Sequence, residues 1–168
     1  MELRKDPITQ SWIVLGHREV AGESLSECPF EPEKMEKMKT ILSWPAEGPW
    51  QVRVVPHPNP LYVLEGDAGR LAEGMYDKMG PLGAHEVVVE TPDHEKRMSQ
   101  FSDEEIERVL WAWGARIADL KKDPRFKYVS VFKKSWCAGR GGVAARALRS
   151  CRDDFCSPSN QIRVARRA

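Results

Sequence analysis

Short apolar runs, each closed by a polar turn, a glycine or a proline, mark strands in the first 133 residues. The run QVRVV alternates apolar and polar residues before it meets Pro56, and EVVVET is apolar enough to be buried on both faces. The predicted strands are Ser11–Leu15, Gln51–Val55, Glu86–Thr91 and Phe126–Phe132.

One long helix is predicted between the last two of these strands. Ser102 and Glu105 form a capping box at its start, and Asp123–Pro124 ends it just after Lys121–Lys122. Strands with one helix packed on the sheet predict an α+β fold. The apolar stripe expected to face the sheet is Ile106, Val109, Leu110, Trp113, Ile117 and Leu120.

Composition excludes several classes of protein. At 168 residues with a net charge of +1, nothing global indicates nucleic acid or a membrane, and no apolar run approaches the ~20 residues that span a bilayer. The polar start MELRKDPITQ lacks an apolar signal core, so we expect a cytoplasmic protein. Four cysteines at irregular spacing do not indicate a disulfide scaffold.

The composition changes sharply after Lys133. Residues 134–168 carry eight Lys/Arg and two Asp/Glu, a net charge of +6, which leaves 18 basic and 23 acidic residues, a net charge of −5, in residues 1–133. We therefore divide the chain into a domain over residues 1–133 and a basic tail over 134–168 that is non-native or disordered.

Five stretches occur in an order that is known from one protein family: ELRKDPITQSWIVLGHR, CPFEPE, VRVVPHPNPLY, GAHEVVVETPDH and DPRFKYVSVFK. Through them residues 2–133 resemble the N-terminal part of the galactose-1-phosphate uridylyltransferases. The resemblance implies an incomplete histidine-triad-like fold, an antiparallel sheet with flanking helices, and a homodimer. It also implies UMP transfer from UDP-glucose to galactose 1-phosphate through a uridylyl-histidine.

The nucleophile of that family is missing from the chain. The family follows the strand that here reads YVSVF with an Asn, a Gly-rich turn and H-x-H-x-Q, whose second His attacks phosphorus. Here Lys134 replaces the Asn, and all four histidines, His17, His57, His85 and His94, precede it. We expect the chain as written to be inactive, because losing the nucleophile of a covalent mechanism costs many powers of ten.

A shifted reading frame explains the tail. Read one base out of frame, the codons for residues 134–137 permit N-R-G-A, and those for residues 145–149 permit H-x-H-S. We therefore predict a single frameshift at about Lys133–Lys134, through gene decay or a sequencing or cloning error. The alternatives are a basic nucleic-acid-binding arm and metal ligation by Cys137, Cys151 and Cys156, which lack C-x-x-C spacing.

Site residues follow only from the resemblance. Cys28 and His94 match ligands of the family's structural zinc, and Glu31 stands at the second Cys position, so a zinc site is incomplete here. Arg18 matches an Arg near the nucleotide phosphates, whereas the family's second Arg corresponds to Ala21.

Two further histidines precede the break in composition. His57 replaces the Asn beside the uridine ribose, and His85 is interpreted as a strand-start residue. The expected partners are a UDP-sugar and a sugar phosphate. The alternatives are a related nucleotide phosphorylase or adenylyltransferase, and a non-catalytic module that binds nucleotide or, through its basic tail, nucleic acid.

Overall fold

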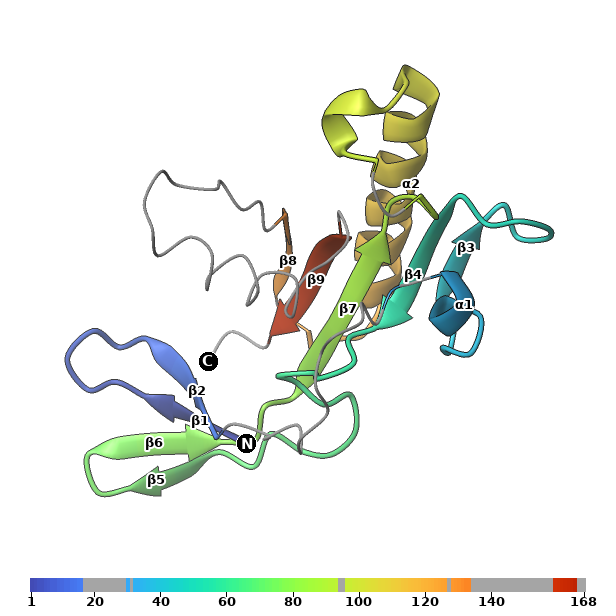
Figure 1. Ribbon diagram of the computed structural model, residues 1–168. Coiled ribbons are helices and arrows are strands. Elements are labelled where there is room, and N and C mark those ends of the chain that lie inside the picture. The colour runs from blue at the N-terminus through green and yellow to red at the C-terminus, as the bar shows by residue number, and fades with distance from the viewer. Residues whose placement is uncertain (17–29, 31, 94–95, 127, 134–158, 166–168) are drawn as a thin grey trace, which may run out of the picture.

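The computed structural model describes residues 1–16, 30, 32–93, 96–126, 128–133 and, as backbone only, 159–165. Two antiparallel sheets and one long helix organise this part of the chain (Figure 1). The larger sheet has the strand order β3-β4-β7-β9-β8. Its strands are β3 (Leu42–Trp44), β4 (Val52–Pro56), β7 (Gly83–Val89), β8 (Tyr128–Lys133) and β9 (Ser159–Ala165).

The smaller sheet has the strand order β2-β1-β6-β5, and the N-terminus of the chain lies at this sheet (Figure 1). The chain passes from β6 into β7 through a short link in which the Leu82 side chain is buried. The strands of the smaller sheet are β1 (Glu2–Lys5), β2 (Trp12–Leu15), β5 (Leu71–Glu73) and β6 (Tyr76–Met79).

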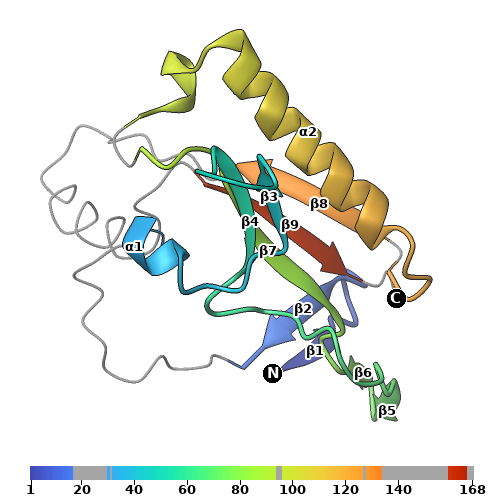
Figure 2. The same ribbon diagram turned by 90° about the vertical axis from the view of Figure 1, so that its right-hand side faces the viewer.

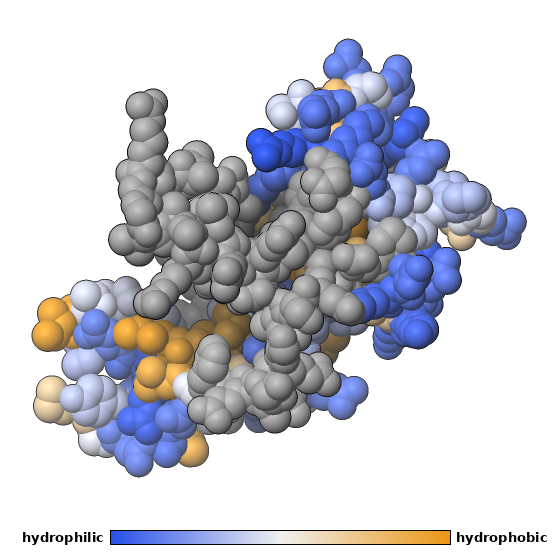
Figure 3. Space-filling view, viewed as in Figure 1, coloured by the Kyte–Doolittle hydropathy of each residue, from blue (hydrophilic) through white to orange (hydrophobic). Residues whose placement is uncertain are grey.

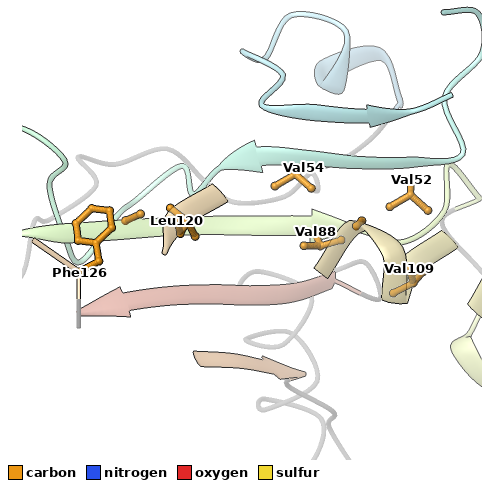
Figure 4. Packing of buried hydrophobic residues seen from close by; sticks show 8 residues of the cluster. Val52, Val54, Val88, Val109, Leu120 and Phe126 are labelled. Atoms are coloured by element: carbon orange, nitrogen blue, oxygen red, sulfur yellow. The ribbon is translucent and has the colours of Figure 1, made fainter. Parts of the chain in front are cut away.

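Strand β7 is the buried centre of the larger sheet. All seven of its residues are buried, so the prediction of a strand covered on both faces is confirmed. Alternate residues of a strand point to opposite faces. On one face Val88 packs with Val54 and Val109 (Figure 4), and on the other Val87 and Val89 pack with Met35 of the short helix α1 (Pro32–Met35).

Helix α2 (Asp103–Leu120) covers the Val88 face of this sheet (Figure 2). It follows a turn of 3-10 helix, η1 (Met98–Gln100), and its predicted capping box is present, since the Ser102 hydroxyl accepts from the Glu105 amide and the Glu105 carboxylate accepts from the Ser102 amide. Such a box satisfies amides that have no partner within the helix.

The buried stripe of α2 differs from the predicted one. Val109 and Leu120 are buried, and Trp113 packs against the core as predicted, but Leu110 is 50% exposed. Ala112 and Arg116 are buried instead. The prediction was wrong at Leu110. The buried face of α2 includes Arg116, and a search for apolar residues alone does not reveal an arginine in contact with the sheet.

Arg116 forms a buried bidentate ion pair with Glu86 of β7. Its Nε and Nη2 each lie 2.8 Å from a Glu86 carboxylate oxygen, and the two side chains are 10% and 5% exposed. Burial alone would lower the pKa of Arg116, but the bonds to Glu86 and Asp119 raise it. The same guanidinium lowers the pKa of Asp119, whose Oδ2 lies 2.8 Å from Nη1.

The predicted fold class is therefore confirmed: antiparallel strands with flanking helices form an α+β structure. Residues 134–158 lie outside the described part, while Ser159–Ala165 forms β9 between β7 and β8. The division of the chain at 133/134 stays a prediction.

We predict that Arg116→Met lowers the free energy of unfolding by about 3–5 kcal/mol, because it leaves the Glu86 carboxylate buried without its cation. The double variant Arg116→Met/Glu86→Leu should recover most of this loss, since an apolar pair of similar volume can replace a buried ion pair. Urea unfolding followed by circular dichroism measures both effects.

Arg125→Met is the matched control, because Arg125 pairs with Asp123 on the surface and its loss should leave unfolding close to that of the parent chain. A single Arg116→Met variant that unfolds like this control would contradict the structural role of the pair.

Candidate functional site

Two histidines meet where β4 ends and β7 begins. The backbone amide of His57 donates to the carbonyl of His85 over 2.9 Å, which extends the pairing of β4 with β7 by one bond. The imidazole rings are stacked, with centroids 4.0 Å apart and planes inclined by 14°. His85 is buried as part of β7, as expected for a residue near a strand start, and His57 is half-buried.

Both rings hold the turn that follows β4. The Asn59 amide donates to Nδ1 of His57 over 3.1 Å, and the Leu61 amide donates to Nδ1 of His85 over 3.2 Å. An imidazole nitrogen accepts a hydrogen bond only when it carries no proton. Pro58 and Pro60 restrict the backbone between these bonds, so the turn 57–61 is fixed from both sides.

Asn59 carries an unsatisfied polar atom in this turn. Its Oδ1 is buried and has no hydrogen-bond partner among the residues that the structure describes. A buried acceptor left in this state costs about 1–3 kcal/mol. In a folded protein such an atom is ordinarily satisfied by water, an ion or a ligand.

A charged groove lies at the opposite end of β4 and β7, with a volume of about 300 Å³. Two ion pairs lie at this groove: Lys133 Nζ lies 2.5 Å from the fully buried Glu90 carboxylate, and Lys96 Nζ lies 2.6 Å from Glu105. The bond from Lys96, followed by that from the Ser102 amide, lowers the pKa of Glu105. The lining residues are Gln51, Val52, Glu90, Thr91, Pro92, Asp93, Lys96, Glu105 and Arg108.

Both ion pairs connect elements of the fold. Lys133 joins the end of β8 to the residue that follows β7, and Lys96 joins the segment after β7 to the first turn of α2.

The sequence-predicted site residues are only partly placed. His57 lies in the His57–His85 pair, whereas Arg18, Cys28, Glu31 and His94 lie outside the described residues, as do Lys134 and the segment expected to hold the nucleophile. Across the described ranges, no three His, Cys, Asp or Glu side chains come together to hold a metal. No helix in the same ranges is long and apolar enough to cross a membrane.

Two residues of the site were not predicted. His85 was predicted to be a strand-start residue and Asn59 had no predicted role, yet the His85 ring bonds the turn after β4 and Asn59 lies within that turn. The motifs P-H-P-N-P and G-A-H-E contain them, but the sequence does not show that they meet. The antiparallel register, which pairs Pro56 with Glu86, brings them together.

Known proteins match this chain in sequence. Residues 65–140 match the family model of galactose-1-phosphate uridyl transferase, N-terminal domain. An ADP-glucose phosphorylase of Arabidopsis thaliana is 26% identical over 149 residues, which cover 79% of this chain and 42% of the relative. A galactose-1-phosphate uridylyltransferase of Thermotoga maritima is 27% identical over 136 residues, 79% of this chain and 40% of the relative.

Solved structures agree with these matches in fold. A uridylyltransferase structure aligns with a TM-score of 0.70 at 23% identity, covering 100% of this chain and 47% of its own. An Arabidopsis thaliana ADP-glucose phosphorylase with bound ADP-glucose aligns with a TM-score of 0.65 at 21% identity, covering 100% and 50%. The predicted resemblance to the galactose-1-phosphate uridylyltransferase family is confirmed. The chain spans less than half the length of the curated relatives it matches.

We predict that each ring protects one amide of the turn 57–61 from exchange, because Nδ1 of His57 accepts from the Asn59 amide and Nδ1 of His85 accepts from the Leu61 amide. Removing one acceptor should lower the protection factor of its amide about five- to tenfold, as measured by hydrogen exchange.

His85→Phe separates the two bonds, because it keeps a ring in the stack but removes the acceptor for Leu61. In this variant the Leu61 amide should lose protection while that of Val88, inside the larger sheet, keeps it. Equal protection of Leu61 in the parent chain and the variant would exclude the His85 bond.

Proposed function

We propose that the chain is the N-terminal, nucleotide-binding part of a nucleotidyltransferase of this family, and that it binds a nucleotide sugar without transferring its nucleotidyl group. The single observation that carries the proposal is that the family-like sequence reaches the end of β8, yet no histidine follows His94 in the chain. The strands that carry the resemblance are therefore present, whereas the histidine that would attack phosphorus is absent from the chain as written.

The chemistry explains why the missing residue matters. Transfer of UMP between UDP-glucose and galactose 1-phosphate through a uridylyl-histidine needs a neutral imidazole in line with the departing phosphate. It also needs donors or cations around the phosphate oxygens, the role proposed for Arg18. Neither His57 nor His85 replaces the nucleophile, because Nδ1 of each accepts from a backbone amide of the turn and a neutral imidazole then carries its proton on Nε2.

The first alternative is a related enzyme of the same family that uses a different nucleotide. One relative is an ADP-glucose phosphorylase, and His57 stands in place of the Asn beside the ribose, so adenine nucleotides compete with uridine nucleotides as ligands. A nucleic-acid-binding module is the alternative from another class, supported by the net charge of +6 in residues 134–168. Salt-dependent DNA binding that is lost on deletion of this tail would favour it.

Other features of the family remain proposals for this chain. Zinc would be held by Cys28, His94 and, as an oxygen ligand, Glu31, and a cytoplasmic location rests on the sequence alone. A homodimer is supported by exposed apolar residues on the smaller sheet, which Figure 3 shows as orange atoms over the β1–β2 hairpin. They include Ile8, Ile13 and Leu15.

The test is covalent labelling with UDP-glucose that carries ³²P at the α-phosphorus. The chain as written should bind UDP-glucose by calorimetry but acquire no acid-labile label. A chain whose gene is returned to the other frame at codon 134, so that it encodes H-x-H-S, should bind UDP-glucose and acquire the label.

The matched control is the frame-restored chain with the second histidine of H-x-H replaced by asparagine, which should bind but not become labelled. Stoichiometric labelling of the chain as written would contradict the proposed loss of activity. Failure of every form to bind either UDP-glucose or ADP-glucose would contradict the nucleotide-binding function.

A further inference from the structure

The charged groove lies away from the turn 57–61, between the first turns of α2 and the far ends of β4 and β7. Val52 lines the groove and packs with Val109 in the core beneath α2, so the groove lies on the helix side of the larger sheet. The His85 ring belongs to the opposite face, because alternate residues of β7 point to opposite faces. The groove, of about 300 Å³, is therefore separate from the His57–His85 pair.

Arg108 lines this groove without a partner of its own. The neighbouring ion pairs, Lys133–Glu90 and Lys96–Glu105, are already formed. Arg108, in contrast, makes no ion pair or hydrogen bond with any residue that the structure describes. The bond from Lys96 is the largest cause of the lowered pKa of Glu105, and Arg108 adds only a smaller effect through its charge. Its guanidinium therefore keeps its N–H donors, which have the geometry to hold a carboxylate through two parallel bonds.

Two partly exposed tryptophans adjoin the groove. Trp44 of β3 pairs in register with Val52, and its carbonyl accepts from the Gln51 amide over 2.7 Å, so its side chain lies beside these two lining residues. Trp111 follows Arg108 by three residues, which places both on one side of α2. The two indole rings lie 5.0 Å apart and are inclined by 59°. Trp44 is 41% exposed and Trp111 43%, whereas tryptophan is highly buried on average.

The charges of the groove favour an anion of low charge. Its lining residues carry three carboxylates, on Glu90, Asp93 and Glu105, and two cations, on Lys96 and Arg108. A phosphate monoester, with a charge near −2, would be repelled by these acids, whereas a carboxylate brings a single charge. An aromatic ring joined to that carboxylate would find the two indoles at tilted or offset angles, which aromatic pairs prefer. A pocket of this volume is at the small end of ligand sites.

We propose that this groove binds a small aromatic carboxylate, with the carboxylate on Arg108 and the ring against Trp44 and Trp111. The two neighbouring ion pairs stay formed, because neither Lys96 nor Lys133 is needed to hold the ligand. The site lies at the other end and on the other face of the larger sheet from the turn 57–61. The inference therefore goes beyond the proposed nucleotide-binding function and does not depend on it.

The test is calorimetry on the 168-residue chain with 2-naphthoate as the probe. The parent chain should bind 2-naphthoate, and it should bind 2-naphthylmethanol, which has the same ring without the charge, about tenfold more weakly. Arg108→Gln should weaken 2-naphthoate to the level of the alcohol and leave the alcohol unchanged, whereas Trp111→Leu should weaken both. Arg125→Gln is the matched control, because Arg125 pairs with Asp123 beyond the end of α2, and it should bind both probes like the parent.

Three results would overturn the inference. If the parent chain does not bind 2-naphthoate, the groove is not a site for this class of ligand. If the parent binds 2-naphthoate and 2-naphthylmethanol equally well, only apolar contact is present; this comparison needs no variant, so it holds even if Arg108→Gln fails to fold. If Arg108→Gln unfolds at the parent temperature and binds 2-naphthoate like the parent, the carboxylate is held elsewhere. A parent chain that binds 2-naphthoate but neither UDP-glucose nor ADP-glucose would contradict the proposed function alone.

Discussion

The burial of β7 is the constraint on which the rest of the structure depends. Its seven residues lie in the middle of the larger sheet with protein on both faces, so each polar group that it carries needs a partner from a neighbouring element. The ion pair of Glu86 with Arg116 fixes α2 against one face of β7. On the other face, the His85 ring accepts a hydrogen bond from the turn after β4. One strand thus fixes both the helix and the candidate site.

The ion pair with Arg116 is one of two charge pairs that connect β7 to its neighbours. The ion pair joins α2 to β7, and Lys133 joins the end of β8 to Glu90 at the end of β7. None of these residues follows position 133, where the composition changes. Strand β9, which pairs with β7 and β8, comes from the segment after that position.

Periodicity and capping were sufficient to predict β2, β4, β7, β8 and α2, because each combines a regular apolar pattern with a clear end signal. The short strands β1, β5 and β6 were missed, since polar residues such as Arg4 and Lys78 interrupt any pattern. The burial of Arg116 and the stacking of His57 on His85 each depend on a partner about 30 residues away in the sequence. The local pattern of apolar and polar residues does not reveal such contacts. The motifs alone indicated His57, but only the register of β4 on β7 revealed Asn59 and its open acceptor.

The most direct measurement is the DNA sequence of the gene from the codon for Phe132 through Trp136 and onward past codon 168. A frameshift predicts one inserted or missing base near Lys133–Lys134, or an alternative frame that encodes H-x-H-S and stays open beyond codon 168. Confirmation of the printed frame, with no family-like sequence downstream in any frame, would contradict it. The basic segment would then be a genuine part of the protein.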